Sequence, residues 1–238
     1  MKSIHIITPV KDSIDTTIDT VKAIMSSDIK VPFTYTIYND FSTPENTQRL
    51  EKASKEYGFQ LVNLSDLTDH PSPNYLLVLQ KTQKEAIEAD AGLLIVESDV
   101  TVQKDTLQAL FDGASERKDC GMAAAITTDE NGEINFPYLY AKGRKPQVYD
   151  EKKRFSFCCT LLTPTFLKAF DFHLLDPTKN WFDVTISHES IYKGFHNYLF
   201  INLPVLHRPH GSRPWKQLKY TNPLKYYWLK FTKGLDKI

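Results

Sequence analysis

A short apolar run that ends in two acids constrains this chain more than any other stretch. Residues 92–96 read Gly-Leu-Leu-Ile-Val, and Glu97-Ser98-Asp99 follows at once. An unbroken apolar run of this length is typical of a strand buried on both faces, as in a mostly parallel sheet. Glu97 and Asp99 therefore come where a central strand leaves the sheet, at the carboxyl edge where open α/β sheets bind ligands.

The spacing of the two acids indicates what they bind. Residues i and i+2 of an extended segment point the same way, so Glu97 and Asp99 can face one site. Two close carboxylates repel each other unless a cation lies between them or one is protonated. A hard divalent ion, Mn²⁺ or Mg²⁺, held by a carboxylate and by the phosphates of a substrate, relieves this repulsion. The alternative is a pair of ordinary polar residues in a loop.

Strand and helix patterns alternate through the first hundred residues. We predict helices between successive strands, and the strands themselves at residues 4–8, 33–38, 59–64 and 92–96. Pro9 is expected to end the first strand. Thr43 is expected to cap the second helix and Pro44 to be its first residue. The order implies right-handed crossovers and a largely parallel sheet, because helices join the strands.

The second half of the chain is predicted to be smaller and richer in strands. Strand patterns recur at residues 121–127, 155–162 and 198–205, and Asn131-Gly132 favours a hairpin turn. Asp183 stands at the start of a predicted helix, where it is a candidate N-cap. We therefore predict an α/β fold with a mostly parallel central sheet flanked by helices, a smaller β-rich half and a C-terminal tail.

The tail is basic and aromatic. From Trp215 onward it holds six lysines against one aspartate, interleaved with Trp, Tyr and Phe. This mixture suits the headgroup region of a membrane, so peripheral membrane contact through residues 215–233 is one expectation. The alternative is that these aromatic residues fold back on the domain or pair subunits.

Composition restricts the partners and the compartment. Lys+Arg and Asp+Glu both total 29, so no overall field favours nucleic acid. Three cysteines, two of them adjacent, form no disulfide framework and indicate a reducing compartment. Residues 1–7 are too short and too broken for a signal peptide, and no apolar run reaches the roughly 18 residues of a spanning helix. We expect a cytoplasmic protein, with any membrane contact at the inner face.

Five short motifs follow one another along residues 4–213: Thr8-Pro9-Val10-Lys11-Asp12, Asn39-Asp40-Phe41-Ser42-Thr43, Glu97-Ser98-Asp99, Phe182-Asp183 and His207. Together, and in this order, they resemble the motifs of a family 2 glycosyltransferase with the GT-A, Rossmann-like fold. The resemblance implies inverting transfer of a sugar from a nucleotide-diphosphate donor to a glycan or lipid-linked acceptor. It also implies a single domain over residues 1–213, with the donor bound by residues 1–101 and the acceptor by 102–213, before a tail at 214–238.

The resemblance assigns roles to particular residues. Asp183 matches the general base, and Asp99 and His207 match groups at the metal, to which we add His210 as a candidate ligand. Arginine suits bidentate phosphate contact, which makes Arg213 a candidate. The residues expected to bind the donor are Thr8, Pro9, Asp40, Glu97, Ser98 and Arg213.

Three positions depart from the family pattern and keep other functions open. Asn39 stands in place of an acid, Phe41 in place of glycine and Glu97 in place of the first Asp of D-x-D. A catalytically silent nucleotide-sugar-binding domain is therefore one alternative. A nucleotidyltransferase is another, although such enzymes need a glycine-rich basic loop after the first strand, and residues 11–13 lack glycine. A dehydrogenase is disfavoured, since G-x-G-x-x-G is missing.

Overall fold

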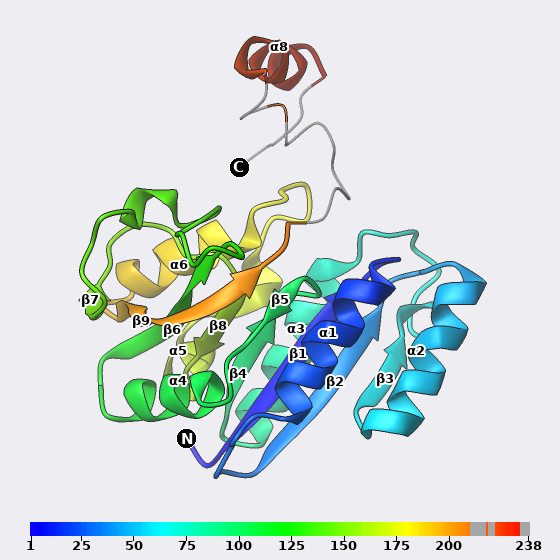
Figure 1. Cartoon of the computed structure of the whole chain (residues 1–238), viewed down its shortest axis with the longest axis horizontal. Coiled ribbons are helices and arrows are strands. Elements are labelled where there is room, and N and C mark those ends of the chain that lie inside the picture. Colours follow the sequence, from blue (N-terminus) through cyan, green and yellow to red (C-terminus); the bar gives the residue numbers. More distant parts are fainter. Residues whose placement is uncertain (210–217, 219–221, 234–238) are drawn as a thin grey trace.

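The computed structural model describes residues 1–209, 218 and 222–233, and its centre is one mixed, nine-stranded sheet (Figure 1). Four parallel strands form its first half: β1 (Ser3–Val10), β2 (Phe33–Asn39), β3 (Gln60–Asn63) and β4 (Ala91–Val96). They lie in the order β3-β2-β1-β4. This arrangement confirms the largely parallel half that the alternation of strand and helix patterns predicts.

The second half of the sheet mixes directions. It contains β5 (Val100–Thr101), β6 (Cys120–Thr128), β7 (Val148–Asp150), β8 (Cys159–Leu162) and β9 (His196–His207). β8 lies between β4 and β6 and runs antiparallel to both. β9 runs parallel to β6 and antiparallel to the short strands β5 and β7. The β-rich half is therefore joined to the parallel half through β8.

Helices cover both faces of the sheet. One face carries α1 (Ile14–Met25), α2 (Pro44–Tyr57) and α4 (Thr106–Ser115), and the other carries α3 (Tyr75–Glu88), α5 (Pro164–Ala169) and α6 (Phe182–Tyr192). Short 3₁₀ helices span Leu64–Asp66, Leu139–Ala141 and Phe172–Leu174. All six residues of β4 are buried between the two layers, which confirms the prediction from its apolar run.

Local signals set the ends of α2. Thr43 Oγ1 accepts a hydrogen bond from the Asn46 N–H at 3.4 Å, and Pro44 is the first helical residue, as predicted. Gly58 ends the helix with a φ of 80°, in the left-handed region that favours glycine.

The expected end of β1 at Pro9 is wrong, because the strand continues to Val10. β4 pairs with β1 only as far as Ile7, so the β4 side of β1 is unpaired at Pro9. A proline, which has no N–H to donate, is tolerated where a strand has an unpaired side.

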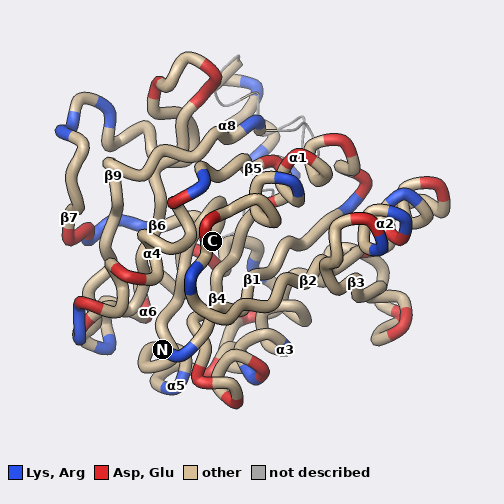
Figure 2. The backbone as a smooth tube through the Cα atoms, turned by 60° about the horizontal axis from the view of Figure 1, so that its bottom comes forward, with Lys and Arg blue, Asp and Glu red and all other residues tan. Residues whose placement is uncertain are grey.

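The C-terminal helix α8 (Pro223–Lys233) projects from the rest of the molecule in Figure 1. None of the helices in the described part of the chain is long and apolar enough to cross a membrane. Acidic and basic residues are interspersed over the helices and loops of the main body (Figure 2). Basic residues are therefore concentrated in the sequence of the tail, and not over the surface as a whole.

Candidate active site

Four polar side chains meet at the carboxyl edge of the parallel strands. Glu97 and Asp99 follow β4, Cys158 immediately precedes β8, and His207 is the last residue of β9. The Glu97 N–H donates to the Cys158 carbonyl oxygen at 3.0 Å, and Val100 lies opposite His207 across the β5–β9 pair. Backbone pairing thus brings residues more than a hundred positions apart into one cluster, here called the acid–thiol–imidazole cluster.

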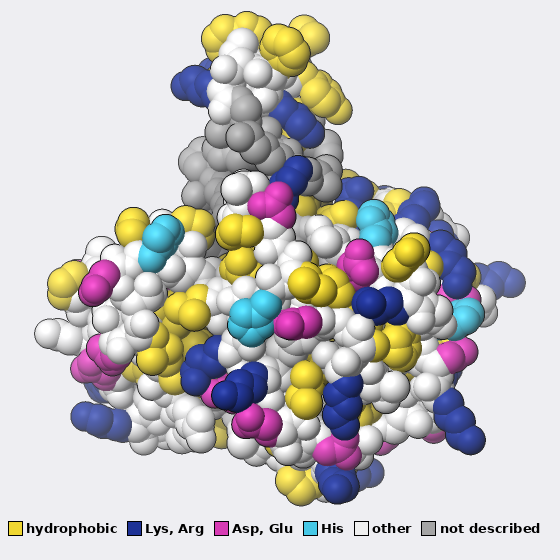
Figure 3. Space-filling model, turned by 180° about the vertical axis from the view of Figure 1, so that it is seen from behind, with side chains coloured by type: hydrophobic (Ala, Val, Ile, Leu, Met, Phe, Trp, Pro, Cys, Tyr) yellow, Lys and Arg dark blue, Asp and Glu magenta, His cyan; other side chains and the backbone are white. Residues whose placement is uncertain are grey.

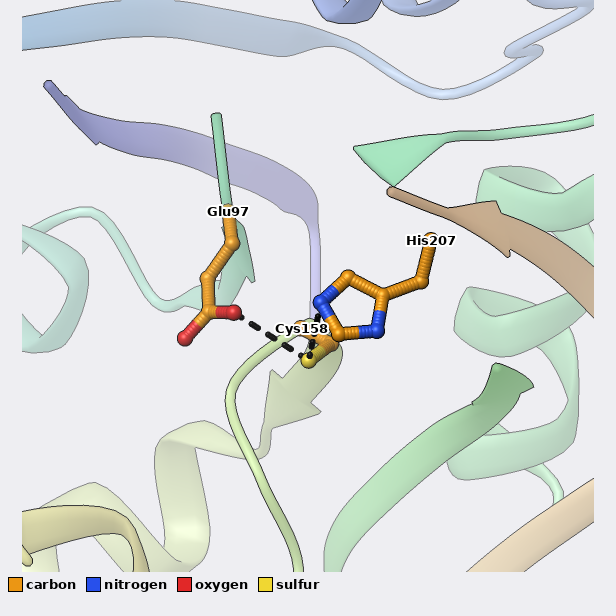
Figure 4. A group of neighbouring side chains, drawn as sticks. All are labelled: Glu97, Cys158 and His207. Atoms are coloured by element: carbon orange, nitrogen blue, oxygen red, sulfur yellow. Dashed lines mark hydrogen bonds between the residues drawn. The ribbon is translucent and has the colours of Figure 1, made fainter. Parts of the chain in front are cut away.

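The side chains of this cluster are close enough to share one ligand (Figure 4). The Cys158 thiol donates to Glu97 Oε2 at 3.1 Å, and its Sγ lies 3.9 Å from His207 Nε2. His207 Nε2 is in turn 3.7 Å from Asp99 Oδ2. Asp99 and His207 are only 7% and 4% exposed. A carboxylate as buried as that of Asp99 is costly without a compensating positive charge, which a cation at this position would supply.

A backbone hydrogen bond determines which nitrogen of His207 faces the cluster. Nδ1 lies 2.7 Å from the Phe136 carbonyl oxygen, which can only accept, so Nδ1 carries a proton. In the neutral ring, Nε2 then directs its lone pair toward Asp99 and Cys158. Metal-binding histidines are usually held in this way. The structure therefore brings together the predicted metal residues Asp99 and His207, while His210 lies outside the described residues.

The donor atoms of the cluster fit a divalent ion. Carboxylate oxygens and an imidazole nitrogen are ligands that Mn²⁺ accepts, and Mg²⁺ is satisfied mainly by oxygen. Cys158 adds a sulfur atom that the sequence analysis missed. Burial, and after it the Glu97 carboxylate, raises the pKa of the Cys158 thiol, so the thiol is protonated when no ion is bound.

Asp183 lies in the first turn of α6. The prediction that it caps this helix is wrong: Trp181 occupies the N-cap position, and Asp183 Oδ1 accepts the neighbouring Val184 N–H at 2.9 Å. Its carboxylate lines a small pocket of about 20 Å³, room for a single water molecule. The pocket is lined by Phe136, Pro137, Arg154, Phe155, Ser156, Trp181 and Asp183.

This pocket shares two of its walls with the acid–thiol–imidazole cluster. One is Phe136, whose carbonyl oxygen holds His207. The other is Ser156, whose Oγ lies 3.4 Å from the sulfur of Cys158. The candidate base, Asp183, is therefore a neighbour of the candidate metal residues, although the two groups come from different elements.

Tyr75, at the start of α3, connects the same two groups. Burial, followed by the carboxylates of Glu97 and Asp183, raises the pKa of its phenol. Its hydroxyl oxygen is buried and has no hydrogen-bond partner among the described residues. Both carboxylates thus raise the pKa of one buried phenol. No local motif links residue 75 to residues 97 and 183, so Tyr75 was not predicted to be part of the site.

Two predicted donor-binding side chains make contacts within the protein. Thr8 Oγ1 shares a hydrogen bond of 3.0 Å with the Tyr35 hydroxyl inside the core, so this side chain points away from the surface. Ser98 Oγ lies 2.9 Å from Ser13 Oγ. We therefore predict contact with the donor only for the backbone groups of Thr8 and of the neighbouring Pro9. The role of Ser98 in donor binding also stays a prediction.

Asp40 orders the segment that leads into α3. Its carboxylate accepts hydrogen bonds from Ser72 Oγ at 2.8 Å, from the Asn74 N–H at 2.9 Å and from Asn74 Nδ2 at 2.8 Å. The next residue, Phe41, has a φ of 57°, so a bulky side chain stands in the left-handed conformation that suits the glycine of the family pattern. Contact of Asp40 with a base or ribose stays a prediction, and Arg213 lies outside the described residues.

Comparison with known proteins identifies the fold. The sequence matches no protein-family model and no curated protein. The structure is similar to residues 1–349 of TarS from S. aureus, with a TM-score of 0.64 and 18% identity over 87% of this chain and 60% of that one. It is also similar to the mannosyltransferase PcManGT from Pyrobaculum calidifontis in complex with GDP-Man and Mn²⁺, with a TM-score of 0.63 and 11% identity over 97% of this chain and 64% of that one.

A further similar structure is GalNAc-T7 with UDP, GalNAc and Mn²⁺, with a TM-score of 0.66 and 12% identity over 97% of this chain and 47% of that one. These neighbours are glycosyltransferases of the GT-A type, and this chain has the GT-A fold. It spans less than two thirds of the length of each of them.

Proposed function

We propose that this chain is a glycosyltransferase that transfers a sugar from a nucleotide-diphosphate donor to a hydroxyl group of a glycan or lipid-linked acceptor. The observation that carries the proposal is the position of Asp99 and His207 beside the pocket of Asp183, at the carboxyl edge of a GT-A sheet. Neighbours of this fold in complex with GDP-Man and Mn²⁺, or with UDP and Mn²⁺, support this class of donor.

Asp99 and His207 would hold a divalent ion, Mn²⁺ or Mg²⁺, with His210 as a further candidate ligand. The ion would offset the negative charge that grows on the diphosphate as the sugar leaves, and so stabilise the transition state more than the ground state. Glu97 and Arg213 are assigned to the donor side of the same site, Arg213 through its guanidinium and the phosphate oxygens.

Asp183 is the proposed general base. Its carboxylate would accept the proton of the acceptor hydroxyl while the hydroxyl oxygen attacks the anomeric carbon. Because the new bond forms as the bond to the diphosphate breaks, attack from the opposite face inverts that carbon, as the family 2 resemblance implies. Trp181, which lines the same pocket, is the candidate for stacking against a sugar ring.

A screen of ligand-induced stabilisation tests the proposal. The full chain is heated with UDP-, GDP- and dTDP-sugars, with and without Mn²⁺. A ligand at 100 times its Kd stabilises the folded state by about 2.7 kcal/mol. We expect one class of donor to raise Tm, and to do so more strongly with Mn²⁺. No stabilisation by any nucleotide sugar would contradict the proposal.

Turnover separates an enzyme from the alternative of a silent binding domain. The left-handed Phe41, at a position where the family has glycine, is the observation that favours this alternative. We expect slow hydrolysis of the stabilising donor, stimulated by Mn²⁺. Binding without any hydrolysis or transfer would favour the silent domain.

The exposed face of α8 supports a membrane partner. Leu224, Tyr227, Trp228 and Phe231 are 86%, 59%, 62% and 91% exposed. Their spacing of i, i+3, i+4 and i+7 confines them to an arc of about 100° on the helix. In Figure 3 hydrophobic side chains gather on the outer part of the projecting helix, with basic side chains beside them.

The charges of α8 indicate what this face would meet. The helix carries Lys225, Lys230 and Lys233, and residues 222–233 contain no acid. Lysines that flank an aromatic face suit the headgroup region of a membrane, where each basic residue contributes about 1 kcal/mol near an anionic surface. We therefore propose that α8 docks on an anionic membrane surface, at the cytoplasmic face, where a lipid-linked acceptor would be presented.

Replacement of both Trp228 and Phe231 by serine is expected to abolish vesicle binding. Burial of two such side chains is worth roughly 3 kcal/mol or more, so the bound fraction on phosphatidylglycerol vesicles should fall by more than tenfold. Co-sedimentation measures this fraction. Leu174→Ser is the matched control, since Leu174 is 75% exposed but lies outside α8. Equal pelleting of the unaltered chain and the double variant would contradict membrane docking.

A further inference from the structure

Cys158 places a sulfur atom in the candidate metal site. Glu97, Cys158 and His207 each present one potential ligand atom, and these three atoms lie within 4.8 Å of one another. Figure 4 shows the sulfur between the carboxylate and the imidazole ring. Cys158 is buried, so this thiol is part of the site's interior wall rather than of the outer surface.

The separations within the cluster resemble those of ligand atoms around one small ion. Metal–ligand bonds of about 2.0–2.3 Å at tetrahedral angles place neighbouring ligand atoms about 3.3–3.8 Å apart. The sulfur lies 3.9 Å from His207 Nε2, and that nitrogen lies 3.7 Å from Asp99 Oδ2. The distance from the sulfur to Glu97 Oε2 is shorter, 3.1 Å, because the thiol donates a hydrogen bond there. Small side-chain shifts would therefore seat an ion.

A sulfur ligand changes which ion such a site prefers. Mg²⁺ and Mn²⁺ are satisfied by carboxylate, carbonyl and water oxygens, whereas a thiolate selects softer ions such as Zn²⁺. Co²⁺ binds similar ligand sets and reports on them spectroscopically. An alanine or serine at residue 158 would have left a site of oxygen and nitrogen only.

We propose that Cys158 is a ligand of this ion site, together with His207 and a carboxylate of Glu97 or Asp99, and that it makes the site prefer Zn²⁺ and Co²⁺ to Mg²⁺. This inference rests on the proposed function, because both use the same ion site. When the ion binds, the thiol releases its proton to solvent and the thiolate forms the bond to the metal. Sugar transfer would then depend on the thiolate only through the identity of the bound ion.

Cys159 provides a matched control. It is the next residue along the chain, lies in β8 opposite Val96, and is buried in the hydrophobic core. A serine at position 159 removes a buried thiol as a serine at position 158 does, but leaves the cluster intact. Cys158→Ala serves as a second variant at the site, since it adds no hydroxyl that could itself bind an ion.

The experiment compares metal binding by the full chain and these variants. With Co²⁺, the unaltered chain and Cys159→Ser should show a thiolate-to-cobalt charge-transfer band in the near ultraviolet, and Cys158→Ser and Cys158→Ala should lack it. Calorimetric titration should show Zn²⁺ affinity at least about tenfold weaker in both Cys158 variants, with Mn²⁺ affinity changed by less than about threefold. X-ray absorption of the unaltered chain loaded with Zn²⁺ should detect one sulfur at about 2.3 Å.

The outcomes separate this inference from the proposed function. A cobalt band that persists in the Cys158 variants, or a zinc spectrum without sulfur, would overturn the assignment of Cys158 while leaving a metal site of oxygen and nitrogen. Failure of the unaltered chain to bind Mn²⁺, Mg²⁺, Co²⁺ or Zn²⁺, with or without a nucleoside diphosphate, would overturn both. Loss of the band in both Cys158 variants, with Cys159→Ser unaffected, would support the assignment.

Discussion

Asp183→Asn is expected to lower kcat by roughly 10²–10⁴-fold while donor affinity stays within about twofold of its original value. The substitution keeps the size of the side chain and its place in the first turn of α6, but an amide cannot accept a proton at neutral pH. The acceptor hydroxyl would then attack without a base. Donor contacts are assigned to the ends of β1, β2 and β4, on other elements, so binding should persist.

Steady-state transfer assays and calorimetric titration of the donor measure these two quantities on the same protein. Asp15→Asn is the matched control, because Asp15 also lies in the first turn of a helix, α1, yet is exposed and paired with Arg49. It tests whether loss of a helix N-terminal charge alone affects the rate. Equal losses of donor affinity and rate in Asp183→Asn would count against the base role.

Asp99→Asn is expected to remove both metal stimulation and metal-dependent donor binding. Asp99 is 7% exposed, and its Oδ2 lies 3.7 Å from His207 Nε2, so an amide there removes the charge that would attract the ion. A loss of about 100-fold in kcat/KM, equivalent to roughly 2.7 kcal/mol of transition-state stabilisation, is the expected size. Unlike Asp183→Asn, this variant should also bind the donor more weakly when Mn²⁺ is present.

Donor titration with and without Mn²⁺ separates the two variants. Glu51→Gln on the exposed side of α2 removes a carboxylate far along the chain from the cluster and serves as the control for net charge. The fold should survive Asp99→Asn, because the Asp99 backbone carbonyl still accepts the Arg208 N–H at 2.9 Å. A variant that keeps its response to Mn²⁺ would exclude Asp99 as the metal residue.

The features that the sequence predicted well are set by local physical chemistry. The apolar run before Glu97 must be buried on both faces, and β4 is. Thr43 and Pro44 begin α2, because a hydroxyl that accepts a backbone N–H and a ring with the helical φ favour that position whatever packs around it. The same reasoning failed for Asp183, since Trp181 occupies the N-cap position and the acid lies two residues further on, inside the first turn.

Contacts that depend on strand register could not be predicted in this way. Cys158 reaches Glu97 because β8 inserts antiparallel beside β4, with Cys159 opposite Val96, and no motif near either residue encodes that register. Tyr75 reaches the site only through the packing of α3 against the sheet. His207 was expected at the metal by resemblance alone, and its pairing with Val100 supplies the physical reason for its position.

The most direct test of the central claim is a crystal structure of the full chain with Mn²⁺ and a nucleoside diphosphate, with manganese located by its anomalous scattering. We expect the manganese peak within bonding distance of Asp99 and His207, the diphosphate oxygens on the same ion, and the Asp183 carboxylate facing the space beyond the β-phosphate. Manganese bound elsewhere, or a diphosphate away from the carboxyl ends of β1 and β4, would contradict the claim.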